Sequence, residues 1–336
     1  MQSFIKEVGR GKKGAKDLSF EEAREAAARI WDGEATDAQI GAFLMAERMK
    51  SETVEELLAF VEEGRARTAK IDSVRNGVLD CAGAYDGRGK SFAATIPTSA
   101  VLAAWDVPVV LHGSRTLPPK YGVALIDIME ELGVPVERDA HQAGDSLQRS
   151  QVAFLDTEAF CPPLHRLRPI REQLGVRSLL NTAEKFLNPA GADFLIAGVF
   201  HSTALDKAAE LMMRLGHRKG MVVQGVDGSE DVPVNRPSGI CIISEGVAEK
   251  QLIDPQEYGL KAEMESVKLS PAEQAAGVVG VLQDATHPYR NFVLWNSAIR
   301  LLLIEKAADL GAGIEMARAV LDDGRAWAAF QSWANR

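Results

Sequence analysis

The stretch VLDCAGAYDGRGKSF, residues 78–92, passes from a short apolar run through a glycine-rich turn towards a helical segment. The same order of strand, turn and helix recurs along the rest of the chain. Further strand candidates lie at 107–111, 195–199, 221–224 and 240–243, with helical patterns at 98–105, 122–132 and 203–216. Such alternation is typical of an α/β fold with a central, mostly parallel sheet.

The first 68 residues have a different pattern, in which helix-start signals follow one another with no strand candidate between them. Ser19–Glu22, Thr36–Gln39 and Thr53–Glu56 each have the sequence of a capping box, in which the side chains at the two ends satisfy backbone N–H groups. Each box predicts the start of a helix, so this part of the chain is expected to be a helical unit.

We therefore expect two domains. A small N-terminal helical domain covers residues 1–72 and is completed by part of 165–190, and a large α/β domain covers residues 73–336. Within the larger one, Ser270–Glu273 is a further capping box with proline at the first helical position, and it predicts a largely helical final third.

Composition narrows the class of protein. The 336 residues are 46% apolar, enough for a substantial core, and the formal net charge of −9 argues mildly against attraction of nucleic acid to the whole surface. Cys81, Cys161 and Cys241 are too scattered for a disulfide framework or a zinc motif, which indicates a reducing compartment. With no secretory signal and no apolar stretch of about 18 residues, we expect a cytoplasmic protein.

The glycine-rich turn is the first candidate for binding chemistry. Glycines allow backbone N–H groups to turn inward, the following helix N-terminus favours anions, and Arg88 and Lys90 add positive charge. This pattern predicts a phosphate site. An ordinary surface turn between a strand and a helix remains an equally good interpretation, since a short glycine-rich loop is a weak signal by itself.

Three further groups follow other predicted elements. His112, Ser114 and Arg115 come after the second strand and offer donors to an anion, although a histidine there is more often structural. The arginines between residues 166 and 177 suit carboxylate or phosphate, although a solvated helix face explains them as well. Glu230 and Asp231 follow the strand at 221–224 and suit Mg²⁺, or form an ordinary acidic turn.

Taken in order, these groups resemble the anthranilate phosphoribosyltransferase family over nearly the whole chain. The stretch Gly33–Met45 is similar to its helical region, and residues 80–92 match its diphosphate loop in length. His112-Gly113 and Arg115 match three positions of its Lys-His-Gly-Asn-Arg motif. The segment that the family places beside anthranilate is matched at Arg171, Leu174-Gly175, Arg177, Asn181 and Asn188-Pro189.

The resemblance implies a homodimer formed through the helical domains and a reaction in which an amine displaces diphosphate from phosphoribosyl diphosphate with Mg²⁺. It also implies a role for each matched position. His112 and Arg171 would serve the acceptor and the reaction, and Glu230 and Asp231 would hold Mg²⁺. The phosphorylated donor would be held by Gly83, Gly87, Arg88, Lys90, Thr95 and Arg115.

Several of the family's positions are altered. Its loop Gly-Thr-Gly-Gly-Asp reads Gly83-Ala-Tyr-Asp-Gly87 here, which replaces glycines by Tyr85 and Asp86 and brings a carboxylate to the expected diphosphate site. Its Gly-Pro-Leu is replaced by Glu184-Lys185-Phe186, and its metal-binding Asp-Glu is reversed. These changes resemble a paralogue group of the family that carries a Tyr-Asp-Gly-Arg loop and an Arg-Gly-Lys turn, and that includes nucleic-acid binders.

Two functions therefore stay open, besides a role as a purely structural relative. The first is a phosphoribosyltransferase-type glycosyltransferase with an altered donor loop and an uncertain acceptor. The alternative is a non-catalytic homodimer that binds DNA or RNA without regard to sequence, because aligned basic side chains give binding of that kind. Its candidate contacts are Arg10, Lys12, Lys13, Lys16, Arg166, Arg168 and Arg177.

Overall fold

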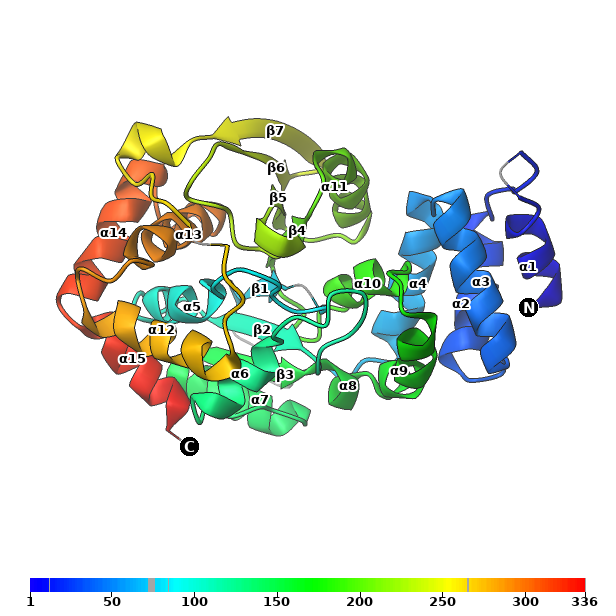
Figure 1. Ribbon diagram of the computed structural model, residues 1–336, viewed down its shortest axis with the longest axis horizontal. Coiled ribbons are helices and arrows are strands. Elements are labelled where there is room, and N and C mark those ends of the chain that lie inside the picture. Colours follow the sequence, from blue (N-terminus) through cyan, green and yellow to red (C-terminus); the bar gives the residue numbers. More distant parts are fainter. Residues whose placement is uncertain (12, 72–75, 84, 265, 336) are drawn as a thin grey trace.

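A computed structural model describes residues 1–11, 13–71, 76–83, 85–264 and 266–335. The chain begins with helices at one end of the molecule, and its C-terminus lies at the other end, on the far side of the sheet (Figure 1). The capping boxes at Ser19, Thr36 and Thr53 are all present, so these predicted helix starts are confirmed. The helices of this part are α1 (Gln2–Val8), α2 (Phe20–Trp31), α3 (Asp37–Lys50) and α4 (Val54–Ala66).

The remainder is built on a seven-stranded sheet in the order β3-β2-β1-β4-β5-β6-β7. The strands from β3 to β5 in this order run parallel, while β6 and β7 are antiparallel, which confirms the mostly parallel sheet. The sequence patterns do not predict β3 or β7; β7 is an edge strand with almost every side chain exposed. The strands are β1 (Leu79–Ala82), β2 (Val109–Gly113), β3 (Val152–Asp156), β4 (Phe194–Val199), β5 (Lys219–Gln224), β6 (Ser238–Ser244) and β7 (Val247–Ile253).

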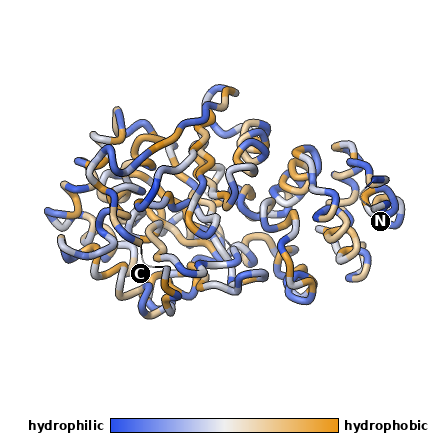
Figure 2. The backbone as a smooth tube through the Cα atoms, turned by 45° about the horizontal axis from the view of Figure 1, so that its top comes forward, coloured by the Kyte–Doolittle hydropathy of each residue, from blue (hydrophilic) through white to orange (hydrophobic). Residues whose placement is uncertain are grey.

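Helices cover both faces of the sheet, and alternate strand residues serve different cores. In β4, Phe194 and Ile196 pack in the core shared with α5 and the C-terminal helices, whereas Leu195 and Ala197 pack in the core shared with α11 and the N-terminal helices. Hydrophobic and hydrophilic stretches alternate along the N-terminal helices (Figure 2). The helices of this part are α5 (Thr95–Ala103), α6 (Leu125–Glu131), α7 (Ala140–Ser150), α8 (Thr157–Phe160), α9 (Pro162–Leu174), α10 (Leu180–Ala183), α11 (Leu205–Arg214), α12 (Pro271–Gln283), α13 (Arg290–Leu303), α14 (Leu310–Asp322) and α15 (Arg325–Ala334).

The strand order places a topological switch point between β1 and β4. The chain adds β2 and β3 on one side of β1 and then adds β4 and β5 on its other side. Loops leaving the carboxyl ends of β1 and β4 therefore separate, and crevices at such points are where open α/β sheets bind ligands. The helices α9 and α10 lie between this edge and the N-terminal helices, where they contact α3 and α4 (Figure 1). In the described ranges, no helix is long and apolar enough to cross a membrane.

A buried titratable side chain lies inside the helical part. Glu47 on α3 is fully buried, and its Oε2 lies 3.4 Å from the ammonium of Lys50. The same ammonium contacts Glu56 at 2.6 Å and Asp17 at 2.9 Å. Two buried carboxylates thus share one lysine. Burial, together with the nearby Glu56, raises the pKa of Glu47 to about 8.

We expect Glu47→Gln to abolish part of the pH dependence of stability. Because the pKa of Glu47 is raised in the folded chain, the stabilising protonated form is lost as pH rises through about 8. As pH rises towards 8, the free energy of unfolding of the original chain should therefore fall by up to about 1.4 kcal/mol per pH unit, and above about pH 8 this contribution should level off. Urea unfolding between pH 6 and pH 9 should show a flatter profile for the variant, and the exposed Glu34→Gln should keep the slope of the original chain. Equal slopes for both variants would contradict this account.

Candidate functional site

A cleft of 210 Å³ lies at the switch point. Its walls come from the loop after β1 (Tyr85 and Asp86), from the end of β4 (Gly198 and Val199) and from the segment that follows α9. That segment brings Arg177 and Lys185 to the cleft, while an apolar side is formed by Phe186, Phe200, Ala204 and Ala208. The cleft therefore combines cationic groups with an apolar wall at the place where the fold class binds its ligands.

Tyr85, in the loop after β1, has its side chain inside the protein. Its ring is buried, and its hydroxyl contacts Nδ1 of His112 in a short hydrogen bond and Thr157 Oγ1 at 2.9 Å. His112 Nε2 lies 2.8 Å from Asp80 Oδ1, so this histidine is enclosed between the two side chains. Burial alone would lower the pKa of His112, but Asp80 outweighs it and the pKa lies above its usual value. The histidine predicted to serve the acceptor is thus buried and lies against the Tyr85 hydroxyl.

Asp86 is the carboxylate that the altered loop brings into the cleft. It is buried, yet its Oδ2 lies 2.7 Å from Arg177 Nη2 and its Oδ1 lies 3.0 Å from Lys120 Nζ. Arg177 and Lys120 balance the charge of Asp86, and Lys185 lies near enough to interact electrostatically with these three side chains. Cationic side chains therefore outnumber carboxylates at this end of the cleft, which favours entry of an anion.

The glycine-rich turn does point backbone donors inward. The N–H groups of Gly89 and Lys90 donate to Asp227 Oδ2 at 3.0 Å and 3.2 Å, and Ser91 Oγ donates to the same oxygen at 2.6 Å. The Lys90 side chain itself is exposed. Gly87 has φ +79°, and a Cβ there would lie 2.5 Å from the Gly122 backbone, so a glycine is required. The Asp227 carboxylate thus accepts the backbone hydrogen bonds that the sequence predicts for a bound phosphate.

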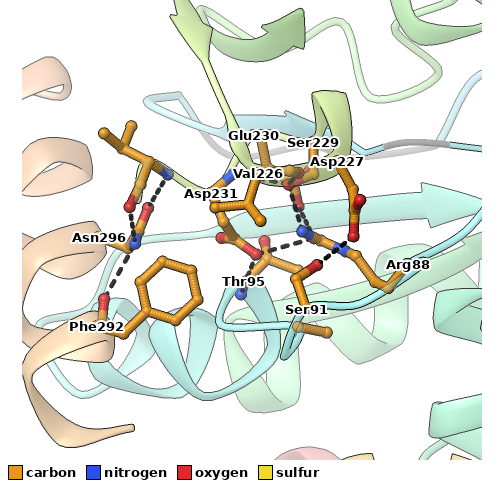
Figure 3. Close-up of polar contacts among 12 residues, drawn as sticks. Arg88, Ser91, Thr95, Val226, Asp227, Ser229, Glu230, Asp231, Phe292 and Asn296 are labelled. Atoms are coloured by element: carbon orange, nitrogen blue, oxygen red, sulfur yellow. Dashed lines mark hydrogen bonds and ion pairs between the residues drawn. The ribbon is translucent and has the colours of Figure 1, made fainter. Parts of the chain in front are cut away.

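The predicted metal-binding pair is enclosed by guanidinium groups, as Figure 3 shows for Arg88. Both carboxylates are fully buried. Arg88 Nη2 lies 3.3 Å from Glu230 Oε1 and 2.9 Å from Asp231 Oδ2, and Arg300 Nη2 lies 3.0 Å from Asp231 Oδ1. The Thr95 N–H donates to Asp231 Oδ2 at 3.2 Å. Burial alone would raise the pKa of Glu230, but the two guanidiniums outweigh it and lower the pKa.

Asp231 and Glu230 differ in whether they have an oxygen free to bind Mg²⁺. Both oxygens of Asp231 are taken by Arg88, Arg300 and the Thr95 N–H. Glu230 Oε2, by contrast, is buried and accepts no hydrogen bond in the described part of the chain. Within those residues, no group of three or more histidine, cysteine or acidic side chains is arranged to hold a metal. Mg²⁺ often binds through one or two carboxylates and substrate phosphates, and Glu230 fits that role.

Arg171 and Arg115 are both engaged by carboxylates. Arg171 is buried in a two-fold ion pair with Glu184, with N–O distances of 2.5 Å and 2.8 Å. Arg115 is exposed and lies 2.7 Å from Asp127, with Glu130 beside it. Gly83 lies against the metal-binding pair, since a Cβ there would be 3.3 Å from Glu230 Oε2. The structure thus gathers Gly83, Arg88, Thr95, Glu230 and Asp231 into one cluster and leaves Arg115 on the surface.

The basic residues proposed for nucleic acid do not form one surface. Arg10 and Lys16 follow α1 and pair with Glu7 on that helix, whereas Arg166 and Arg168 lie on α9. Arg166 donates to the backbone carbonyls of Ile30 and Trp31, and Arg168 pairs with Glu158. Arg177 pairs with Asp86, Lys13 is exposed, and Lys12 lies outside the residues that the structure describes. The nucleic-acid alternative gains no support from this arrangement.

Sequence patterns miss several charged residues of the site. Arg300 lies in the largely apolar helix α13, and only the tertiary structure shows that it pairs with Asp231. Lys120 follows two prolines with no motif around it, and its contact with Asp86 is a tertiary one. Lys185 and Glu184 are visible in the sequence as replacements of the family's Gly-Pro-Leu. That replacement is the signal from which a changed site can be predicted.

Comparison with known proteins agrees with this fold. The chain matches the glycosyl transferase family, helical bundle domain, over residues 2–68 and the a/b domain of the same family over residues 76–327. An anthranilate phosphoribosyltransferase of Methylocella silvestris is 32% identical over 92% of this chain and 88% of its own length. One from Pelotomaculum thermopropionicum is 32% identical over 97% of this chain and 93% of its own length.

Solved structures show the same similarity. Anthranilate phosphoribosyltransferase from Thermus thermophilus superposes with a TM-score of 0.84 at 28% identity, covering 98% of both chains. The enzyme from Saccharomyces cerevisiae, solved in complex with PRPP and Mg, has a TM-score of 0.83 at 17% identity and covers 99% of this chain and 96% of its own. The second match shows the fold alone. The expected homodimer stays a prediction.

Proposed function

The chain belongs to the anthranilate phosphoribosyltransferase family of glycosyl transferases, and we propose that it binds a phosphoribosyl diphosphate-type donor in the switch-point cleft and transfers its phosphoribosyl group. The acceptor is a nucleophile. One observation carries the proposal: two cations, Arg177 and Lys120, both contact the carboxylate of Asp86 where β1 and β4 end. This surplus of positive charge favours a ligand with several phosphate charges.

Binding would proceed by exchange of anions. Phosphate oxygens would replace Asp86 on Arg177 and Lys120, and would replace Asp227 on the N–H groups of Gly89 and Lys90. Both internal carboxylates already occupy positions suited to an anion, and each would have to move aside as the phosphate enters. Such transfer depends mainly on positioning and on stabilising the charge of the leaving diphosphate. Mg²⁺, when bound, would neutralise part of that charge, and Glu230 Oε2 is the oxygen available to hold it.

Calorimetric titration tests the proposal directly. The protein is titrated with phosphoribosyl diphosphate, with and without Mg²⁺, and release of diphosphate is then followed with anthranilate as a trial acceptor. Saturable heat with the donor is the expected result, and diphosphate release would establish turnover with that acceptor. No heat at millimolar donor, with or without Mg²⁺, would exclude the proposed function.

We expect Asp86→Asn to strengthen binding of phosphoribosyl diphosphate by about tenfold, since one negative charge near the ligand costs on the order of 1–2 kcal/mol in a partly buried site. The amide keeps the size of the side chain and leaves Arg177 and Lys120 without a carboxylate partner. Calorimetry gives the dissociation constants. The exposed Asp145→Asn on α7 is the control and should match the original chain. An unchanged affinity in Asp86→Asn would show that this carboxylate does not obstruct the donor.

A further inference from the structure

Lys185 is the cation of the cleft that no carboxylate holds. Its ammonium donates to the backbone carbonyls of Gly198 at 2.7 Å and Gly228 at 3.0 Å. Within the described part of the chain it forms no ion pair, and an ammonium has three N–H donors. Two carbonyls therefore fix the position of the charge and leave one donor for a ligand in the cleft.

Arg171, the cation that the family resemblance assigns to the acceptor, is in a different situation. Both of its terminal nitrogens are bound by Glu184, and both side chains are buried. A ligand carboxylate that took Arg171 would leave Glu184 buried and without a partner. Removing one member of a buried ion pair costs about 3–5 kcal/mol, which is more than a single charged hydrogen bond returns. Arg171 is therefore a poor receptor for an acceptor's anionic group.

The surroundings of Lys185 suit a small aromatic anion. Phe186 lies next to it in sequence, and Phe200, which is 52% exposed, lines the same cleft. An exposed aromatic ring that lines the same cleft as a fixed cation can stack on the ring of a ligand while the cation binds the charged substituent.

The charge of Lys185 depends on its neighbours. Burial, followed by the nearby Arg177, lowers the pKa of Lys185 to about 8, and Lys120 acts in the same direction. Asp86 and Glu230 face it with the opposite sign and partly compensate. At pH 7 the ammonium is still mostly protonated, and a bound anion would stabilise that form.

We propose that Lys185, in place of Arg171, binds the anionic group of the acceptor in the switch-point cleft. This inference rests on the proposed transfer function, because it concerns the second substrate of that reaction. The anionic group is a carboxylate or a phosphate on an aromatic ring, since a single ammonium receives both. Lys185 is thereby the residue that determines acceptor specificity.

Direct binding of three probes tests the inference without the donor. Anthranilate carries a ring carboxylate, phenyl phosphate a ring phosphate, and aniline no anionic group. Lys185→Met should weaken binding of the preferred anion by about tenfold or more, the loss expected for a charge-assisted hydrogen bond, and should leave aniline unchanged. Lys185→Arg should retain most of the affinity. Lys250→Met, the same change at an exposed lysine of β7, should have no effect.

The pH profile provides a second readout that a merely structural role would not change. Anion affinity of the original chain should fall as pH rises through about 8, whereas Lys185→Arg should show no such fall. Thermal unfolding confirms that each variant is folded. Equal anion affinity in the original chain and in Lys185→Met overturns the inference, and so does the absence of anion binding to the original chain. Donor binding is measured separately, so a failure here leaves the proposed function standing.

Discussion

Replacing Arg88 by methionine is expected to lower the free energy of unfolding by about 3–5 kcal/mol, the loss typical of removing one partner from a buried ion pair. Glu230 and Asp231 are fully buried. Their two charges are balanced by Arg88, which Figure 3 shows beside them, and by Arg300. Without Arg88, one buried carboxylate has no compensating charge. Urea unfolding at pH 7 measures the difference between the variant and the original chain.

A double variant separates charge from packing. Arg88→Met combined with Glu230→Gln removes one cation and one carboxylate together, so the buried cluster is again neutral. We expect the double variant to recover a substantial part of the stability lost by Arg88→Met. If the free energy of unfolding of Arg88→Met lies within about 1 kcal/mol of that of the original chain, the cluster is hydrated and these ion pairs do not control the stability of the site.

Substituting Gly198 by alanine is expected to destabilise the protein by about 3 kcal/mol or more, since overpacking against backbone is relieved only by moving a strand or a loop. A Cβ at Gly198 would lie 1.7 Å from the carbonyl oxygen of Ser229. Ser229 directly precedes the buried acids, so the required shift would move Glu230 and Asp231 away from their guanidinium partners. The carbonyl of Gly198 also positions Lys185, and acceptor binding should weaken with it.

The matched control for this strand substitution is Gly239→Ala in β6. A Cβ there would meet only Leu205 Cδ1 at 3.4 Å, an ordinary van der Waals contact. We expect this control to change the unfolding free energy by less than about 1 kcal/mol. Comparable losses in the two variants would mean that any added methyl group in the sheet is disruptive, and that the close approach of β4 to Ser229 has no special importance.

The elements that the sequence predicts correctly are those with local causes. The capping boxes at Ser19, Thr36, Thr53 and Ser270 lie where the helices begin, because each box is a contact between residues three apart. Buried strands such as β1 and β4 are recognisable as apolar runs. β7 has no such signal, since nearly all its side chains are exposed and its pairing with β6 uses backbone groups.

The partners of the charged residues were not predictable in this way. The sequence marks Asp86 as a carboxylate in a phosphate loop, but its neutralisation by Lys120 and Arg177 joins residues up to 91 positions apart. Arg88 reaches Glu230 across 142 positions. The sequence likewise marks the glycine-rich turn as an anion site, and the tertiary structure places the carboxylate of Asp227 on it.

By itself, then, the sequence determined the helical and α/β parts, the parallel sheet, the family and the loops from which the site is built. Only the tertiary structure decided which of the site's charges are already paired, with Arg171 bound to Glu184 and Lys185 left to the cleft. The physical reason is range. Capping and hydrophobic periodicity act between residues a few positions apart, whereas the pairing of a buried charge depends on whichever side chain the fold brings within about 4 Å of it.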